Sequence, residues 1–200
     1  MTENDRALIR VSAALASHDE EALVEIFCEA RQVADSQQIE EAILQSYLFL
    51  GFPVALAGMA VWRRQTESHF KQSTPLDCEG WAARGHDVCR AVYAGKYDKL
   101  REHVRTLHPD LELWMVVEGY GKVLGRPGLT LVTRELCIVA SLAVLGASKQ
   151  LYSHMRGALN VGARSSDVDV ALAEAEVFGD VKDCLEVRKM WEKVKTRNET

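Results

Sequence analysis

Apolar residues recur along most of this chain at steps of three and four, the period that places side chains on one face of an α-helix. Such stripes lie within residues 8–15, 22–33 and 39–50. Gly51 is placed to end the third helix, and Pro53 suits the first turn of a fourth helix that reaches residue 66. The strict alternation of a β-strand is almost absent. The pattern therefore predicts an all-α protein.

The second half of the chain shows the same helical periods. Helices are predicted over residues 77–92, 100–104, 108–117, 151–162, 166–173 and 181–194. Residues 131–145 are apolar on almost every face, which is typical of a helix buried among others. The polar and aperiodic stretch 67–75 is predicted to be the main linker, and the glycine-rich stretch 119–130 a loop with at most a helical end.

The sequence predicts an internal repeat of one group of helices. When Arg6 is placed over Arg134, apolar positions fall on apolar positions through both stretches, with one residue of slippage at a loop. We therefore expect two tandem helical repeats. The first spans residues 1–66, a linker with connecting helices spans 67–110, and the second repeat spans 111–200.

The two copies differ in their polar residues. Glu135 and His154 in the second copy fall opposite Ala7 and Ile26 in the first, so the first copy is degenerate. An unpaired buried charge costs several kcal/mol, so two ionisable groups within apolar helices are site candidates. A carboxylate beside an imidazole forms a proton-transfer pair that works near neutral pH. The alternative is a pair of satisfied polar residues in the core.

Two arginines are candidates for binding an anionic substrate. Arg134 precedes Glu135 directly, and Arg126 lies in the preceding glycine-rich stretch. A guanidinium forms paired hydrogen bonds with a carboxylate, which makes arginine the usual anchor for an organic acid. The alternative for each of them is an ordinary solvated surface position.

Charge and composition argue against several classes of binding partner. The formal net charge of −5 does not fit a nucleic-acid-binding domain and gives no reason to expect an anionic membrane surface as partner. No apolar run is expected to reach the length of about 20 residues that a membrane helix needs. Five widely spaced cysteines without a Cys-x-x-Cys, and a polar start without a signal peptide, favour a cytoplasmic protein. No metal and no cofactor are expected, since His86 with Cys89 gives too few ligands for zinc.

Three motifs resemble the carboxymuconolactone decarboxylase family, whose wider group includes the alkyl hydroperoxidase D-like proteins. They span residues 120–129, 133–135 and 154–162. The resemblance covers residues 111–175 and implies an all-α fold that associates into rings, often trimers or hexamers. In the hydroperoxidase branch a Glu and a His flank a Cys-x-x-Cys. Glu135 and His154 match the ends of that pattern, but Ala147 and Gln150 occupy the cysteine positions, which disfavours thiol peroxidase chemistry.

The resemblance therefore implies a cofactor-free lyase that acts on a small organic acid. His154 would donate a proton, Glu135 would orient it, and Arg134 or Arg126 would hold the substrate carboxylate. Two alternatives stay open, a non-catalytic oligomeric helical protein of the same family and a thiol-dependent peroxidase using Cys137. In each case we expect self-association into a homotrimer or another ring.

Overall fold

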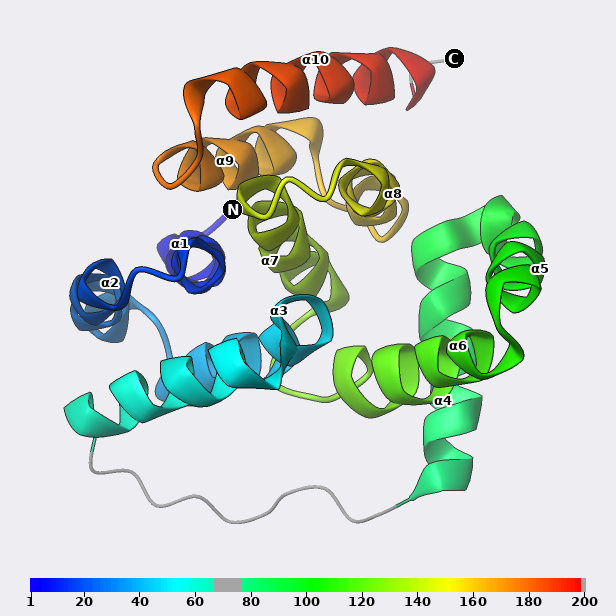
Figure 1. Cartoon of the computed structure of the whole chain (residues 1–200), viewed down its shortest axis with the longest axis horizontal. Coiled ribbons are helices and arrows are strands. Elements are labelled where there is room, and N and C mark those ends of the chain that lie inside the picture. Colours follow the sequence, from blue (N-terminus) through cyan, green and yellow to red (C-terminus); the bar gives the residue numbers. More distant parts are fainter. Residues whose placement is uncertain (67–76, 199–200) are drawn as a thin grey trace. The chain divides into compact units, whose positions relative to one another are not determined.

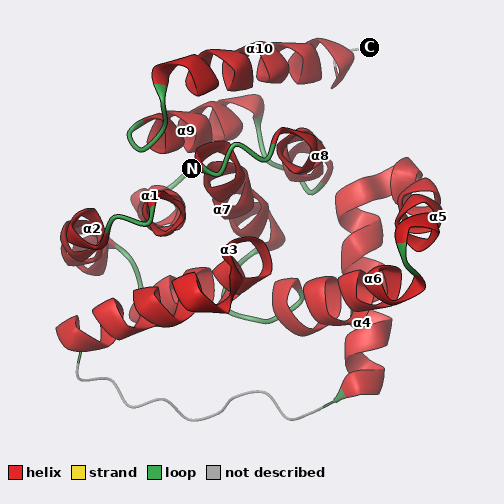
Figure 2. Ribbon diagram, in the orientation of Figure 1, coloured by secondary structure: helices red, strands yellow, loops and turns green. Residues whose placement is uncertain are grey.

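The computed structural model describes residues 1–66 and 77–198, and all regular structure within them is helical (Figure 2). The all-α prediction is confirmed. Contacts divide the chain into two compact units, one formed by Met1–Glu67 with Gly128–Thr200 and the other by Ser68–Pro127. The predicted linker over residues 67–75 lies outside the described residues.

Two helices form the centre of the first unit, α1 (Glu3–Ser17) and α7 (Leu131–Val144). They pack against each other although they lie far apart in the sequence (Figure 1). Their apolar faces are buried, and α7 buries every residue from Thr133 to Leu142, as its nearly all-apolar pattern predicts. The surrounding helices are α2 (Glu20–Val33), α3 (Ser36–Gln65), α8 (Ser148–Asn160), α9 (Ser165–Glu176) and α10 (Val181–Asn198).

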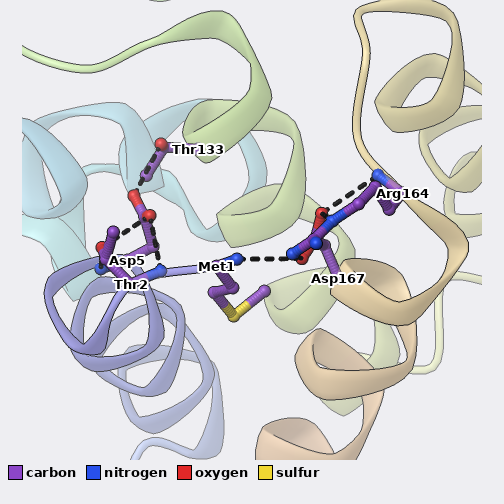
Figure 3. Close-up of polar contacts among 6 residues, drawn as sticks. All are labelled: Met1, Thr2, Asp5, Thr133, Arg164 and Asp167. Atoms are coloured by element: carbon purple, nitrogen blue, oxygen red, sulfur yellow. Dashed lines mark hydrogen bonds and ion pairs between the residues drawn. The ribbon is translucent and has the colours of Figure 1, made fainter.

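The two central helices begin in the same way and are joined at their starts. Thr2 caps α1 by accepting the Asp5 N–H, and Thr130 caps α7 by accepting the Thr133 N–H. The Asp5 carboxylate then accepts hydrogen bonds from the hydroxyl groups of Thr2 at 2.7 Å and Thr133 at 3.0 Å (Figure 3). Asp5 thereby fixes the position at which α7 starts relative to α1.

Helix α3 is kinked at Gly51, whose φ of 80° is left-handed and non-helical. By length and composition α3 is apolar enough to cross a membrane, so the expectation that no apolar run approaches that length is wrong. The kink leaves two straight parts of about 15 residues, each about 22 Å long, which is shorter than the roughly 30 Å of a bilayer core. After the kink, Phe52 and Leu56 are 64% and 66% exposed and form an apolar surface.

Two buried tryptophans, one in each of the two sequence segments of this unit, donate the same kind of hydrogen bond to a carboxylate. The Trp62 indole N–H donates to Glu40 at 2.9 Å, and that of Trp191 donates to Asp169 at 2.7 Å. Each tryptophan follows its carboxylate by 22 residues, and neither side chain is exposed. This parallel supports the tandem repeat, which stays a prediction.

The second unit is built from α4 (Cys78–Tyr93), a short 3₁₀ turn (Ala94–Lys96), α5 (Tyr97–Leu107), α6 (Pro109–Trp114) and the π-helix η2 (Met115–Leu124). The prediction of a loop from residue 119 is therefore wrong as far as Leu124. The glycines there serve packing, because a Cβ on Gly121 would lie 1.9 Å from the Trp81 carbonyl oxygen of α4. The structure also divides the chain at Pro127 and Gly128, whereas the sequence placed the boundary at 110/111, inside α6.

Candidate functional site

Glu135 and His154 lie in contact inside the first unit. Glu135 comes from the first half of α7 and His154 from the middle of α8, and these helices pack against each other. The His154 Nδ1 atom is 2.8 Å from Glu135 Oε2. Glu135 is fully buried and His154 is 5% exposed. The structure thus brings together the two ionisable residues that the sequence singled out.

The chemistry of the carboxylate sets the direction of this hydrogen bond. An ionised carboxylate only accepts hydrogen bonds, so with Glu135 ionised Nδ1 of His154 is the donor. Nε2 is then the imidazole nitrogen that does not contact Glu135. The other oxygen of Glu135, Oε1, is buried and has no hydrogen-bond partner among the described residues. A buried oxygen left in this state calls for an explanation.

An aromatic residue of α3 completes the surroundings of His154. The ring of Phe49 stands edge-on to the imidazole, with ring centroids 5.4 Å apart and planes at 89°. Phe49 lies just before the Gly51 kink, where α3 packs near α7. The candidate site therefore draws on helices from both ends of the sequence. Phe49 was not identified in the sequence, because an apolar position in an apolar helix gives no separate signal.

Arg134 is held in the interior by α3. Its guanidinium is fully buried and lies 2.8 Å from Glu41 Oε2 and 3.1 Å from Gln45 Oε1. Gln45 also donates through Nε2 to the Arg134 carbonyl oxygen at 3.3 Å. Glu41 and Gln45 were missed in the sequence, although two polar residues four apart on an apolar helix were a usable signal. The substrate-binding role of Arg134 stays a prediction, and it would require Glu41 to give up this contact.

The remaining predicted anchor, Arg126, belongs to a different unit of the chain from the pair. Arg126 belongs to the second unit, in the segment between η2 and α7, whereas Glu135 and His154 belong to the first unit. Its predicted role in holding a substrate carboxylate therefore stays a prediction.

The structure shows the surroundings of the residues considered for thiol chemistry and for metal binding. Cys137 is fully buried, and burial raises the pKa of its thiol to about 12, which suppresses the thiolate that peroxide chemistry requires. His86 Nδ1 lies 2.5 Å from the hydroxyl oxygen of Tyr97. Within residues 1–66 and 77–198, no three His, Cys, Asp or Glu side chains gather as a metal ion would need.

Comparison with models of protein families places part of the chain in a known family. Residues 111–193 match the sequence model of the carboxymuconolactone decarboxylase family. The matched stretch includes Glu135, His154 and the helices that carry them. Among curated proteins, none matches the chain.

Proposed function

Since the C-terminal part of this chain belongs to the carboxymuconolactone decarboxylase family, we propose that the protein is a cofactor-free carboxy-lyase acting on a small organic acid. The reaction would be the loss of carbon dioxide from a substrate that leaves a stabilised carbanion or dienolate. Such a reaction needs one well-placed acid and no redox chemistry. The buried pair of His154 and Glu135 supports this proposal more than any other feature of the chain.

His154 would act as the acid in its doubly protonated form. When the bond to the carboxylate breaks, its electron pair stays on the substrate carbon and carbon dioxide departs. The Nε2–H of the imidazolium then gives its proton to that carbon, and the imidazole is left neutral with Nδ1–H still donated to Glu135. Water would return the proton to Nε2 before the next turnover. Glu135 would orient the ring and stabilise its positive charge.

The observation that carries the proposal is the state of the Glu135 carboxylate. One oxygen holds His154 at 2.8 Å, while the other is buried without a partner. A purely structural pair would be expected to satisfy both oxygens, because a buried unsatisfied acceptor costs about 1–3 kcal/mol. A substrate hydroxyl group or a water molecule donating to Oε1 would satisfy it. We infer that this oxygen faces the place where substrate binds.

The experiment is a decarboxylation assay on a panel of muconolactone-like acids with the wild type, His154→Gln and Glu135→Gln. Both variants should stay folded by circular dichroism, and His154→Gln should lower kcat by at least about 100-fold, the usual contribution of a positioned acid. The non-catalytic alternative predicts no turnover of any acid in the panel by the wild type. That outcome would replace the lyase proposal with a structural role for the pair.

A further inference from the structure

Gln45 contacts the residue that precedes Glu135 in two different ways. Its Oε1 accepts a hydrogen bond from the Arg134 guanidinium at 3.1 Å, and its Nε2 donates to the Arg134 carbonyl oxygen at 3.3 Å. Gln45 is itself buried, with 3% of its surface exposed. The carbonyl group that it holds belongs to the peptide unit joining Arg134 to Glu135. Gln45 therefore restrains the main chain at the point where the Glu135 side chain begins.

The chemistry of the amide suits this double contact. A glutamine side chain offers an acceptor and a donor at once, whereas a glutamate at the same place could bind only the guanidinium. Glu41 already neutralises Arg134 at 2.8 Å, so the charge of the guanidinium does not require Gln45. The part that Gln45 adds is the hydrogen bond to the main chain.

Helix α3 contacts His154 and the residue that precedes Glu135 through residues one turn apart. Gln45 holds the peptide unit before Glu135, and Phe49 lies edge-on against the His154 ring. Residues four apart lie on the same face of a helix. One face of α3 therefore sets both the start of the Glu135 side chain and the plane of the imidazole.

We propose that Gln45 is a positioning residue for the Glu135–His154 pair, acting through the Arg134 main chain. This role rests on the proposed function, because it gives the pair a task that needs fixed geometry. Gln45 is not a catalytic residue. Loss of its amide donor lets the peptide unit before Glu135 move, and the carboxylate then spends less time in contact with Nδ1.

The other central helix, α1, offers an internal comparison. Glu174 of α9 binds Arg6 and Arg10 of α1, as Gln45 and Glu41 of α3 bind Arg134 of α7. Glu174 is buried, but a carboxylate cannot donate to a carbonyl oxygen. Around α1 there is no pair to hold, because Ala7 and Ile26 stand where Glu135 and His154 were aligned. The amide of Gln45 therefore binds the central helix that carries Glu135.

The test measures the His154 Nδ1 proton by NMR on protein with ¹⁵N-labelled histidine, assigned by its loss in His154→Gln. Exchange of this proton with water should be about tenfold faster in Gln45→Glu and Gln45→Met, which corresponds to about 1.4 kcal/mol of lost restraint. Gln45→Glu keeps an acceptor for the guanidinium, loses the donor and adds a carboxylate beside Glu41, whereas Gln45→Met removes the donor without adding charge. Glu174→Gln is the matched control, since it changes a buried contact to arginine on the other central helix, and it should leave the exchange rate unchanged.

Two results would overturn the inference. Wild-type exchange in Gln45→Glu would show that the main-chain hydrogen bond does not position the pair. Equal acceleration in Glu174→Gln would show a general loosening of the fold. If Gln45→Met does not fold, Gln45→Glu alone decides. The measurement needs no substrate, so it separates this inference from the lyase proposal. Where turnover is found, Gln45→Glu should lower kcat about tenfold with little change in KM, consistent with the same loss.

Discussion

Replacing Arg134 with methionine should destabilise the protein strongly. The Arg134 side chain is fully buried, and its partner Glu41 is nearly so, with their charged atoms 2.8 Å apart. Arg134→Met would remove the contact of the buried Glu41 carboxylate with this guanidinium. Breaking a buried pair from one side costs about 3–5 kcal/mol, because the remaining charge keeps its desolvation penalty. We expect a loss of that size in the free energy of unfolding.

The double variant Arg134→Met/Glu41→Leu gives the sharper measurement. It removes both charges, and apolar replacement of a buried pair is often close to neutral, so stability should recover to within about 2 kcal/mol of the wild type. Urea unfolding followed by circular dichroism supplies the free energies, and the cycle isolates the coupling between the two residues. Arg6→Met is the control. The Arg6 side chain is 65% exposed and Glu174 keeps Arg10 nearby, so the cost should be about 1 kcal/mol or less.

This experiment also separates two roles of Arg134. A substrate anchor has to exchange its internal partner for a substrate carboxylate, so its loss would raise KM for acid substrates and leave the fold nearly as stable as before. A loss of under about 1 kcal/mol in Arg134→Met, together with no recovery in the double variant, would refute the interior ion pair as a main support of α7. The substrate-binding role predicted from the sequence would then be favoured.

Three further results are expected. Leu56→Glu should lower the molar mass measured by light scattering if the exposed α3 surface mediates self-association, whereas Leu185→Glu, at a similarly exposed leucine, should not. Cys137 should resist a thiol reagent at pH 8 in the folded protein and react after unfolding, because burial raises its pKa to about 12; reaction in the folded state would reopen the peroxidase alternative. Hydrogen bonds from Arg164 lower the pKa of Asp167, so the stability that the Asp167 carboxylate supplies is present above the pKa of an unfolded aspartate and is lost as pH falls through the folded value. Asp167→Asn should therefore lower the free energy of unfolding at pH 7, and the difference from the wild type should shrink as the pH is lowered. A difference that does not change with pH would contradict this role of Asp167.

The sequence predicted the helices and the polar pair for one reason. Apolar periodicity reports which residues are buried, and Glu135 and His154 were conspicuous because they interrupt it. The same reasoning could not show that they touch, since the contact depends on how α7 and α8 cross. It also missed Glu41 and Gln45, whose partner Arg134 lies far along the chain. Side-chain pairing between distant helices leaves no periodic signal.

Glycine caused the clearest error. The cluster around Gly121 was predicted to be a loop, because glycine usually marks a turn. In the structure the chain stays helical, and Gly121 allows the backbones of η2 and α4 to approach closely. Sequence alone does not distinguish these uses, because both depend on the missing Cβ. The spacing of 22 residues shared by Glu40–Trp62 and Asp169–Trp191, in contrast, was visible in the sequence and unused.

The two central helices differ in how their polar residues are satisfied. Around α1, Arg6 is paired with Glu174 and Asp5 with Thr133. Around α7, Arg134 is also paired, but the next residue places a carboxylate oxygen in the interior without a partner. A group of that kind lowers stability by about 1–3 kcal/mol. The turn of α7 that Arg134 joins to α3 therefore also carries an unsatisfied carboxylate oxygen, which is why we assign that carboxylate to a site rather than to the support of the fold.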